Sequence, residues 1–211
     1  METNLDAAEV RVLGCLVEKE ITTPEYYPLT LNALVHACNQ KNNRDPVVSY
    51  DERAVEEALD RLRGRGLAYE LTGGGNRVPK YGHRIVEALN LGRREVAILC
   101  VLMLRGAQTV GEIRDRSERM HSFSDLDEVQ AVLARLGESD PPLAVQLPKL
   151  PGTKEPRYAH LLSGPVDASA PPPAPERRED RLEALEAEVV RLREAVEELQ
   201  RQFGEFRKQF E

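Results

Sequence analysis

The sequence lacks tryptophan altogether, and aromatic residues make up only 5% of its 211 residues. Surfaces that stack bases or sugars need exposed aromatic side chains, so we expect neither a carbohydrate site nor a base-stacking platform. Cysteine is also scarce, with three residues spaced far apart at 15, 38 and 100, each among apolar neighbours. An odd number without a CxxC pair argues against a disulfide framework or a zinc knuckle. We therefore expect buried, reduced thiols in a cytoplasmic protein.

Long apolar runs and catalytic motifs are missing as well. The longest apolar run, 96–104, is far shorter than the roughly 20 residues of a membrane-spanning helix. The acidic N-terminus has no apolar segment, so we expect no signal peptide. The four histidines are isolated, and HExxH, GxSxG and phosphate-loop patterns are absent. The sequence thus predicts no membrane association, no metal, no cofactor and no enzymatic activity.

Excess positive charge is absent too. The chain has 29 basic and 36 acidic residues and a net charge of −7. This balance excludes a strongly basic nucleic-acid-binding protein at the level of overall charge. Any DNA contact must therefore depend on local clusters of basic residues.

The C-terminal part of the sequence has a composition of its own. Proline, alanine and serine dominate 164–176, which predicts a semi-rigid linker. Apolar residues spaced three and four apart through 177–211 then predict a coiled-coil helix. Its valines and leucines and its opposite charges at flanking positions favour a parallel homodimer, although a single helix folding back on the body is an alternative. The predicted dimer contacts are Leu182, Leu185, Val189, Leu192, Val196 and Leu199.

Residues 1–163 show the same order of expected elements twice: three helices, a strand, a turn and a strand. In 1–88 the helices are expected over 7–20, 31–40 and 51–65, and the strands over 67–71 and 77–84. In 89–163 they are expected over 92–104, from 109 and after 124, with strands over 143–147 and 157–162. A Thr109-x-x-Glu112 capping box begins the middle helix. The order predicts a mainly α (α+β) chain with two tandem winged-helix domains, 1–88 and 89–163.

The polar segment NQKNNRDPVVSYDE, residues 39–52, separates two helices of the first half. Asn42 and Asn43 tolerate left-handed backbone, and Pro46 keeps its predecessor out of the helical region. Ser49-x-x-Glu52 is expected to cap the next helix. These features predict a structured corner between helices, called the corner below.

A corner alone leaves part of this segment unexplained. Gln40, Lys41 and Arg44 have no obvious turn-forming role, so we interpret them as candidate contacts to DNA or to a partner protein. The Arg-Asp pair at 44–45 fits such a surface, but it also fits an internal salt bridge that braces the corner.

The run LTLNALVHACNQKNNRDPVVSYDE, residues 29–52, resembles the bacterial YceH-like family. That family is uncharacterised and looks like tandem winged helices, so the resemblance implies the fold and no activity. It covers about 1–164. We expect the linker and the coiled coil to be particular to this chain.

Basic residues are expected mainly in the two hairpins, or wings. The third helix of each half carries acidic residues at its start, where carboxylates would repel DNA phosphates. We therefore expect a dimer that grips the DNA backbone with its wings. The alternative is a scaffold that docks proteins and does not bind DNA. The wing candidates are Arg77, Lys80, Arg84, Lys149, Lys154 and Arg157, with His83 and His160 nearby.

Overall fold

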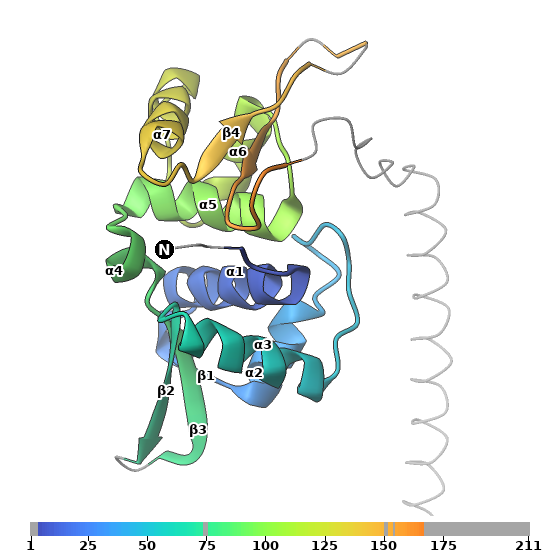
Figure 1. Ribbon diagram of the computed structural model, residues 1–211, viewed down its shortest axis with the longest axis vertical. Helices are drawn as coiled ribbons and strands as arrows, with labels where there is room; N and C mark the ends of the chain where they lie inside the picture. The colour runs from blue at the N-terminus through green and yellow to red at the C-terminus, as the bar shows by residue number, and fades with distance from the viewer. Residues whose placement is uncertain (1–3, 74–75, 150–151, 154, 167–211) are drawn as a thin grey trace, which may run out of the picture. The chain divides into compact units, whose positions relative to one another are not determined.

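The computed structural model describes residues 4–73, 76–149, 152–153 and 155–166 (Figure 1). The first half contains α1 (Ala7–Thr22), the short 3-10 helix η1 (Pro24–Tyr26), β1 (Leu29–Thr30), α2 (Leu31–Cys38), α3 (Glu52–Gly64), β2 (Ala68–Gly73) and β3 (Asn76–His83). The second half contains α4 (Ile85–Leu89), α5 (Arg93–Arg105), α6 (Val110–Ser117), α7 (Leu126–Glu138), β4 (Ala144–Gln146) and β5 (Tyr158–His160). The described part is therefore a mixed fold of helices with small antiparallel sheets.

Both sheets follow the predicted hairpins. In the first half, β3 pairs with β2 and with the short strand β1, in the order β1-β3-β2. In the second half, β4 pairs with β5, and Gln108 forms an isolated antiparallel bridge to Tyr158. Each hairpin is thus extended by a short pairing contributed from the chain before it. Such an arrangement is compatible with a winged helix, and the sequence missed β1, α4 and the bridge at Gln108.

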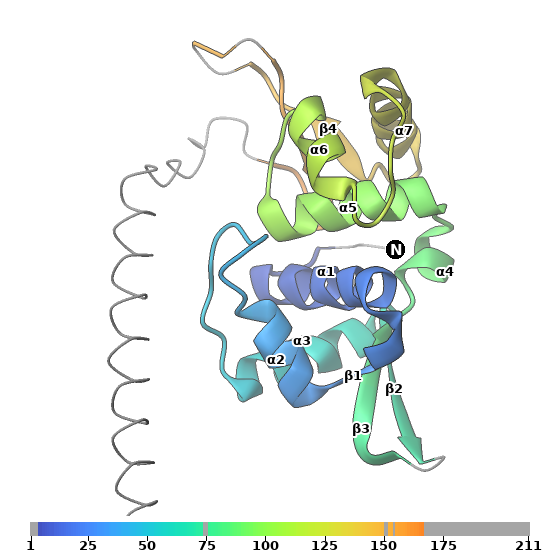
Figure 2. The same cartoon turned by 180° about the vertical axis from the view of Figure 1, so that it is seen from behind.

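The two halves share one hydrophobic core, in which α1 and α5 lie side by side (Figures 1 and 2). Gly14 of α1 is the point of close approach, because a side chain there would meet Leu104 and Met103 of α5. The Cys100 thiol also donates a hydrogen bond of 3.4 Å to the Gly14 carbonyl. Residues on both sides of the predicted boundary at 88/89 therefore pack in one compact unit.

The N-terminal segment ties the ends of this unit together. Asn4 forms an antiparallel bridge with Ser163, and the Leu5 amide donates to the Leu162 carbonyl at 2.8 Å. Leu5 and Leu162 are both buried in the core. Asn4 and Leu5 are thus part of the second half's packing, which periodicity along the sequence does not reveal.

Helix caps decide where most helices start. Thr109 and Glu112 form the predicted capping box, and Asp6 with Glu9 forms another at α1. The predicted Ser49-x-x-Glu52 cap is wrong. Asp51 caps α3 instead, by accepting from the Ala54 amide at 2.8 Å.

Two predicted segments extend beyond the described residues. The coiled coil over 177–211, with all its predicted dimer contacts, lies outside them, as does the linker from 167 onward. None of the helices in the described ranges combines the length and apolar character needed to cross a membrane. The three cysteines are buried and form no disulfide, as expected for structural thiols.

Candidate functional site

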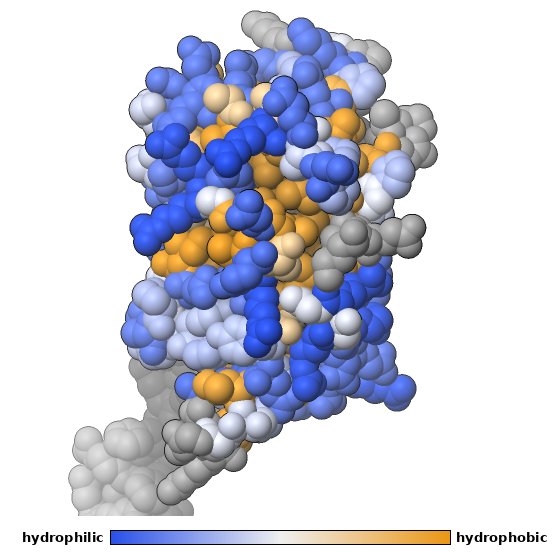
Figure 3. Space-filling view, turned by 60° about the vertical axis from the view of Figure 1, so that its left-hand side comes forward, coloured by the Kyte–Doolittle hydropathy of each residue, from blue (hydrophilic) through white to orange (hydrophobic). Residues whose placement is uncertain are grey.

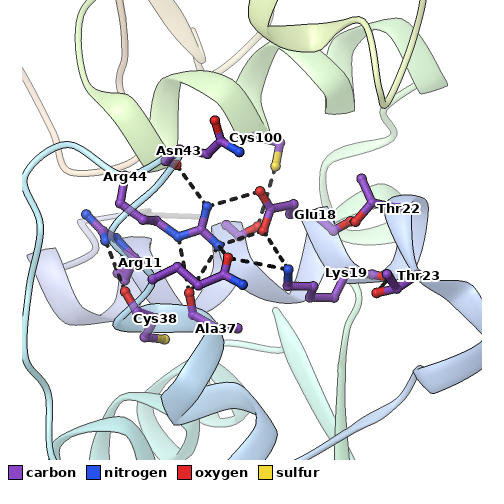
Figure 4. Close-up of polar contacts among 12 residues, drawn as sticks. Arg11, Glu18, Lys19, Thr22, Thr23, Ala37, Cys38, Asn43, Arg44 and Cys100 are labelled. Atoms are coloured by element: carbon purple, nitrogen blue, oxygen red, sulfur yellow. Dashed lines mark hydrogen bonds and ion pairs between the residues drawn. The ribbon is translucent and has the colours of Figure 1, made fainter. Parts of the chain in front are cut away.

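Arg44 is an interior residue of the corner rather than an exposed contact (Figure 4). Its guanidinium donates to both carboxylate oxygens of Glu18 on α1, at 3.0 and 2.6 Å. It also donates to the Ala37 carbonyl at 3.1 and 3.2 Å and to Gln40 Oε1 at 3.0 Å. The prediction of Arg44 as a binding residue is therefore corrected: the internal salt bridge was the better interpretation, with Glu18 rather than Asp45 as the partner.

A second arginine holds the corner from the other side. Arg11 of α1 is buried and donates to the carbonyls of Cys38 and Pro46, at 3.2 and 2.6 Å. Ala37 and Cys38 end α2, so the two arginines satisfy carbonyls that a helix C-terminus leaves without a partner. Because both arginines are used in this way, the corner is fixed on α1.

The charge of Glu18 is stabilised by this arrangement. Burial raises the pKa of Glu18, but the hydrogen bonds and the positive charge of Arg44 outweigh it and hold the pKa below its ordinary value. The carboxylate is therefore ionised at neutral pH and neutralises Arg44. Removing either partner of this buried pair is costly, since loss of Arg44 leaves Glu18 with only Lys19 nearby and loss of Glu18 removes the carboxylate from the buried guanidinium.

Asn39 and Asn43 shape the loop. The Asn39 side chain accepts from the Tyr50 amide at 2.8 Å and donates to the Tyr50 carbonyl at 2.7 Å. This clamp holds Tyr50 outside the helix, which explains why Ser49 cannot cap α3. Asn43 has the left-handed backbone expected for it, with φ of 61°, and its side chain accepts from Arg105 at the end of α5. The Asp45 amide donates to the Leu104 carbonyl at 2.9 Å. The corner thus joins the first half to α5.

A cleft of about 540 Å³ opens beside the corner. It lies where four parts of the chain meet: α1, the corner, the C-terminal end of α5, and α6 with the turn after it. The corner supplies Gln40, Lys41, Asn42 and Asn43. The other lining residues are Glu18, Lys19, Thr22, Val101, Leu104, Arg105, Asp115, Arg116, Arg119 and Met120. Gln40 and Lys41, which have no obvious turn-forming role, therefore line the wall of a cleft.

The wing of the first half presents an apolar and basic face. Val78 and Lys80 lie two residues apart on β3, and Lys80 pairs with Leu71 across the sheet, so the three side chains share one face. Val78 is 53% exposed and Leu71 is 44% exposed. The opposite face holds Glu70, whose carboxylate pairs with Arg63 of α3 at 2.9 Å. The face with Lys80 is therefore turned away from α3.

Arg84 stands at the base of this wing. It is exposed, and its guanidinium carbon lies 5.6 Å from the centre of the Tyr69 ring. Tyr69 in turn covers Gly82, where a Cβ atom would come within 2.4 Å of the ring. Only glycine at position 82 leaves room for the Tyr69 ring. The ring in turn provides the surface beside which the Arg84 guanidinium lies. Arg77 lies in β3 as predicted.

The second wing is less basic than predicted. Lys149 is exposed and Arg157 is half-buried, whereas Lys154 lies outside the described residues. His160 is not a positive group at neutral pH, because burial lowers its pKa to about 4. Burial likewise lowers the pKa of His83 in the first wing, and the neighbouring Glu20 carboxylate only partly offsets it. The expectation that these two histidines add positive charge to the wings is wrong.

The arginines of α3 are occupied by carboxylates. Arg53 pairs with Glu57 at 2.8 Å, Arg61 with Asp6 at 2.8 Å, and Arg63 with Asp60 at 3.0 Å. Acidic Glu52 and Glu56 are exposed on the same helix. The predicted crowding of acids on this helix is thus present on its surface, and these exposed ion pairs would compete with phosphates for its arginines.

Comparison with known proteins identifies the family of this chain. A family model described as "Protein of unknown function, DUF480" matches residues 5–153. The chain belongs to this family. The resemblance seen in residues 29–52 is therefore confirmed at the level of an uncharacterised bacterial family.

Relatives in this family match along the whole chain. A "UPF0502 protein" of Solibacter usitatus is 53% identical over 208 residues, covering 96% of this chain and 100% of its own. One of Citrifermentans bemidjiense is 61% identical over 169 residues, covering 80% and 78% of the two chains. One of Pelobacter propionicus is 50% identical over 220 residues and covers both chains completely. The expectation that the linker and C-terminal segment are particular to this chain is thus wrong, since this relative aligns with them.

Proposed function

We propose that the protein is a non-enzymatic, cytoplasmic DNA-binding protein of the transcription-regulator kind, built from two tandem winged helices. The recurrence of helix, helix, helix and hairpin in both halves supports the winged-helix assignment. DNA contact would run mainly through the sugar–phosphate backbone, because local basic groups rather than overall charge are available. It would therefore be salt-dependent and weakly selective for sequence.

The face of the first wing is the observation that carries this proposal. Exposed Val78 and Leu71 lie beside Lys80, with Arg84 at the base. Proteins that bind the minor groove combine cationic side chains with apolar wedges in this way. The charges of α3 also favour contact through the wing rather than through this helix. Its arginines are paired with carboxylates, and its exposed acidic residues would oppose entry into a DNA groove.

Reversing the charge of Lys80 and Arg84 together, as Lys80→Glu and Arg84→Glu, is expected to weaken duplex binding at least roughly tenfold. The slope of log affinity against log salt should also flatten by about one for each lost phosphate contact. Titration of a fluorescent random-sequence duplex at several salt concentrations measures both. The matched control is Arg93→Glu and Arg135→Glu, which makes the same charge change on α5 and α7. An equal loss of duplex affinity in both double variants would show that only overall charge matters and would contradict a specific role of the wing.

Dimerisation through the C-terminal heptads belongs to the same proposal. Two linked wings would bind one duplex with higher avidity than either alone. Deleting 176–211 is expected to convert a dimer into a monomer, and Leu192→Asp should do the same in the full chain. Sedimentation equilibrium gives the mass directly. A truncated protein that still sediments as a dimer would contradict the coiled coil.

A protein-docking scaffold is the second candidate. Figure 3 shows the side on which α4 lies, where apolar atoms gather across the middle of the surface. Val86 and Leu89 of α4 are only partly buried there against the core. Apolar surface of this kind suits a protein partner. Failure to bind any duplex at low salt would favour this candidate over the first.

A further inference from the structure

We propose that the cleft beside the corner is a binding site for a small phosphorylated anion, such as a phosphate ester of metabolite size. Five of its lining residues are cationic, and two are carboxylates. Glu18, one of those two, is already neutralised by buried Arg44. Lys19 also pairs with Glu18 and Arg116 pairs with Glu112, yet the cations in and around the cleft still outnumber the carboxylates, in a protein whose net charge is −7. The site is independent of DNA binding by the wings.

The cations of the cleft crowd one another. Burial lowers the pKa of Arg105, and the positive charges of Arg116 and Arg44 lower it further. Arg105 contacts the amide oxygen of Asn43 rather than a carboxylate. Arg119 makes no hydrogen bond or ion pair with the rest of the described chain. An anion placed among these groups would relieve their mutual repulsion, which is the energetic basis for binding.

The chemistry of the lining matches a phosphate better than a single carboxylate. Arginine side chains offer planar pairs of N–H donors that suit phosphate oxygens. The amide side chains of Gln40 and Asn42 add neutral polar groups along the corner. Val101, Leu104 and Met120 give the remainder of the wall an apolar character. A ligand with a phosphate and a small organic body fits this combination.

Size separates a small ligand from a nucleic acid. A volume of about 540 Å³ lies within the range of roughly 300–1,000 Å³ that holds small molecules. A double helix is too wide to enter such a concave space, and only its outermost phosphates could reach the rim. The cleft also spans both halves of the chain, from Lys19 on α1 to Arg119 after α6. A bound anion would therefore link the corner to the second half.

Inorganic pyrophosphate is the probe, titrated into the full-length protein by calorimetry in a buffer of fixed ionic strength. We expect saturable binding at one site per chain, and at least tenfold weaker binding in Arg105→Gln and in Arg119→Gln. Both variants are expected to fold, because Arg105 loses only a side-chain hydrogen bond to Asn43 that glutamine can replace, and Arg119 has no partner among the described residues. Arg93→Gln removes an exposed arginine at the first residue of α5, the other end of the helix from Arg105, and serves as the matched control. Its affinity for pyrophosphate should equal that of the parent protein.

Three results would overturn the proposal. One is the absence of saturable binding up to about 10 mM pyrophosphate. Another is binding that Arg105→Gln, Arg119→Gln and Arg93→Gln weaken equally, since this would be general attraction to a charged surface. The third is displacement of pyrophosphate by random duplex DNA together with loss of duplex binding in the two cleft variants, which would assign the cations to the DNA backbone. Pyrophosphate binding without any DNA binding would support the cleft and contradict only the function proposed for the wings.

Discussion

Replacing Arg44 with alanine is expected to lower the free energy of unfolding by about 3–5 kcal/mol, the usual cost of removing one partner from a buried ion pair. The Arg44 side chain is fully buried, and its loss would leave Glu18 with only Lys19, at 3.5 Å, as a counter-ion and would remove the Arg44 donors from the Ala37 carbonyl. Urea unfolding followed by circular dichroism measures the difference. Arg53→Ala is the matched control, because its pair with Glu57 is exposed on both sides and contributes little. A cost for Arg44→Ala no larger than that of the control would contradict the structural role of the corner.

The same pair gives a pH dependence that can be checked with Glu18→Gln. The pKa of Glu18 lies below its ordinary value of 4.5, so the folded state favours the charged carboxylate. The stability gained from that charge is present above the ordinary pKa and is lost as the pH falls through the lower pKa of the folded state. The parent protein should therefore exceed Glu18→Gln in stability at neutral pH, and the difference should shrink below about pH 4.5. If the difference in stability between the two proteins does not change with pH, the charge of Glu18 does not stabilise the corner.

Replacing Gly14 with valine is expected to cost about 1–3 kcal/mol of stability, because it forces side-chain atoms into a filled interface. A Cβ atom at this position would lie 2.9 Å from Leu104 Cδ2 and 3.2 Å from Met103 Cβ. The Met103 Cβ is attached to the backbone of α5, so relief requires that α1 and α5 move apart. Helix propensity alone predicts a small gain when valine replaces glycine here. Gly64→Ala is the control, since nothing lies within 4 Å of its Cβ position, and it should be neutral or slightly stabilising.

The shape of the unfolding transition adds a second test of this interface. Because one core joins the two halves, residues 1–163 should unfold in a single cooperative transition, and Gly14→Val should lower the midpoint of that transition. Two separate transitions, with only one displaced by the substitution, would mean that the halves fold as independent domains. That result would restore the domain boundary expected from the sequence at 88/89.

Local patterns in the sequence were sufficient for the framework of the fold. The helical spacing of Val55, Leu59 and Leu62 predicts the face that α3 buries, and these residues are fully or almost fully buried. The capping box at Thr109 and the hairpins were also predicted, because each depends on residues close together in the chain. The Ser49 cap failed for a non-local reason. Asn39, eleven positions before Tyr50, holds that residue outside the helix, and Asp51 is the cap instead.

The site was harder to predict than the fold. Arg44 looked like a free cation in a polar loop, because its partner Glu18 lies 26 residues away on another helix. The cleft combines Lys19, Arg105 and Arg119 with the corner, and no spacing rule brings these positions together. Even Gln40 and Lys41, which the sequence does single out, are predicted only as contacts to DNA or to a partner protein and not as parts of a cleft. Tertiary packing of α1 against α5, and of α5 against α6, creates the concavity.

Binding of random-sequence duplex DNA to the full-length protein, titrated from low to physiological salt, tests the proposed function most directly. We expect measurable affinity at low salt, and we expect its logarithm to fall linearly with the logarithm of the salt concentration, with a slope proportional to the number of phosphates contacted. The Lys80→Glu and Arg84→Glu protein should show a flatter line. Absence of binding even at the lowest salt would contradict the DNA-binding proposal and leave the docking scaffold as the function to pursue.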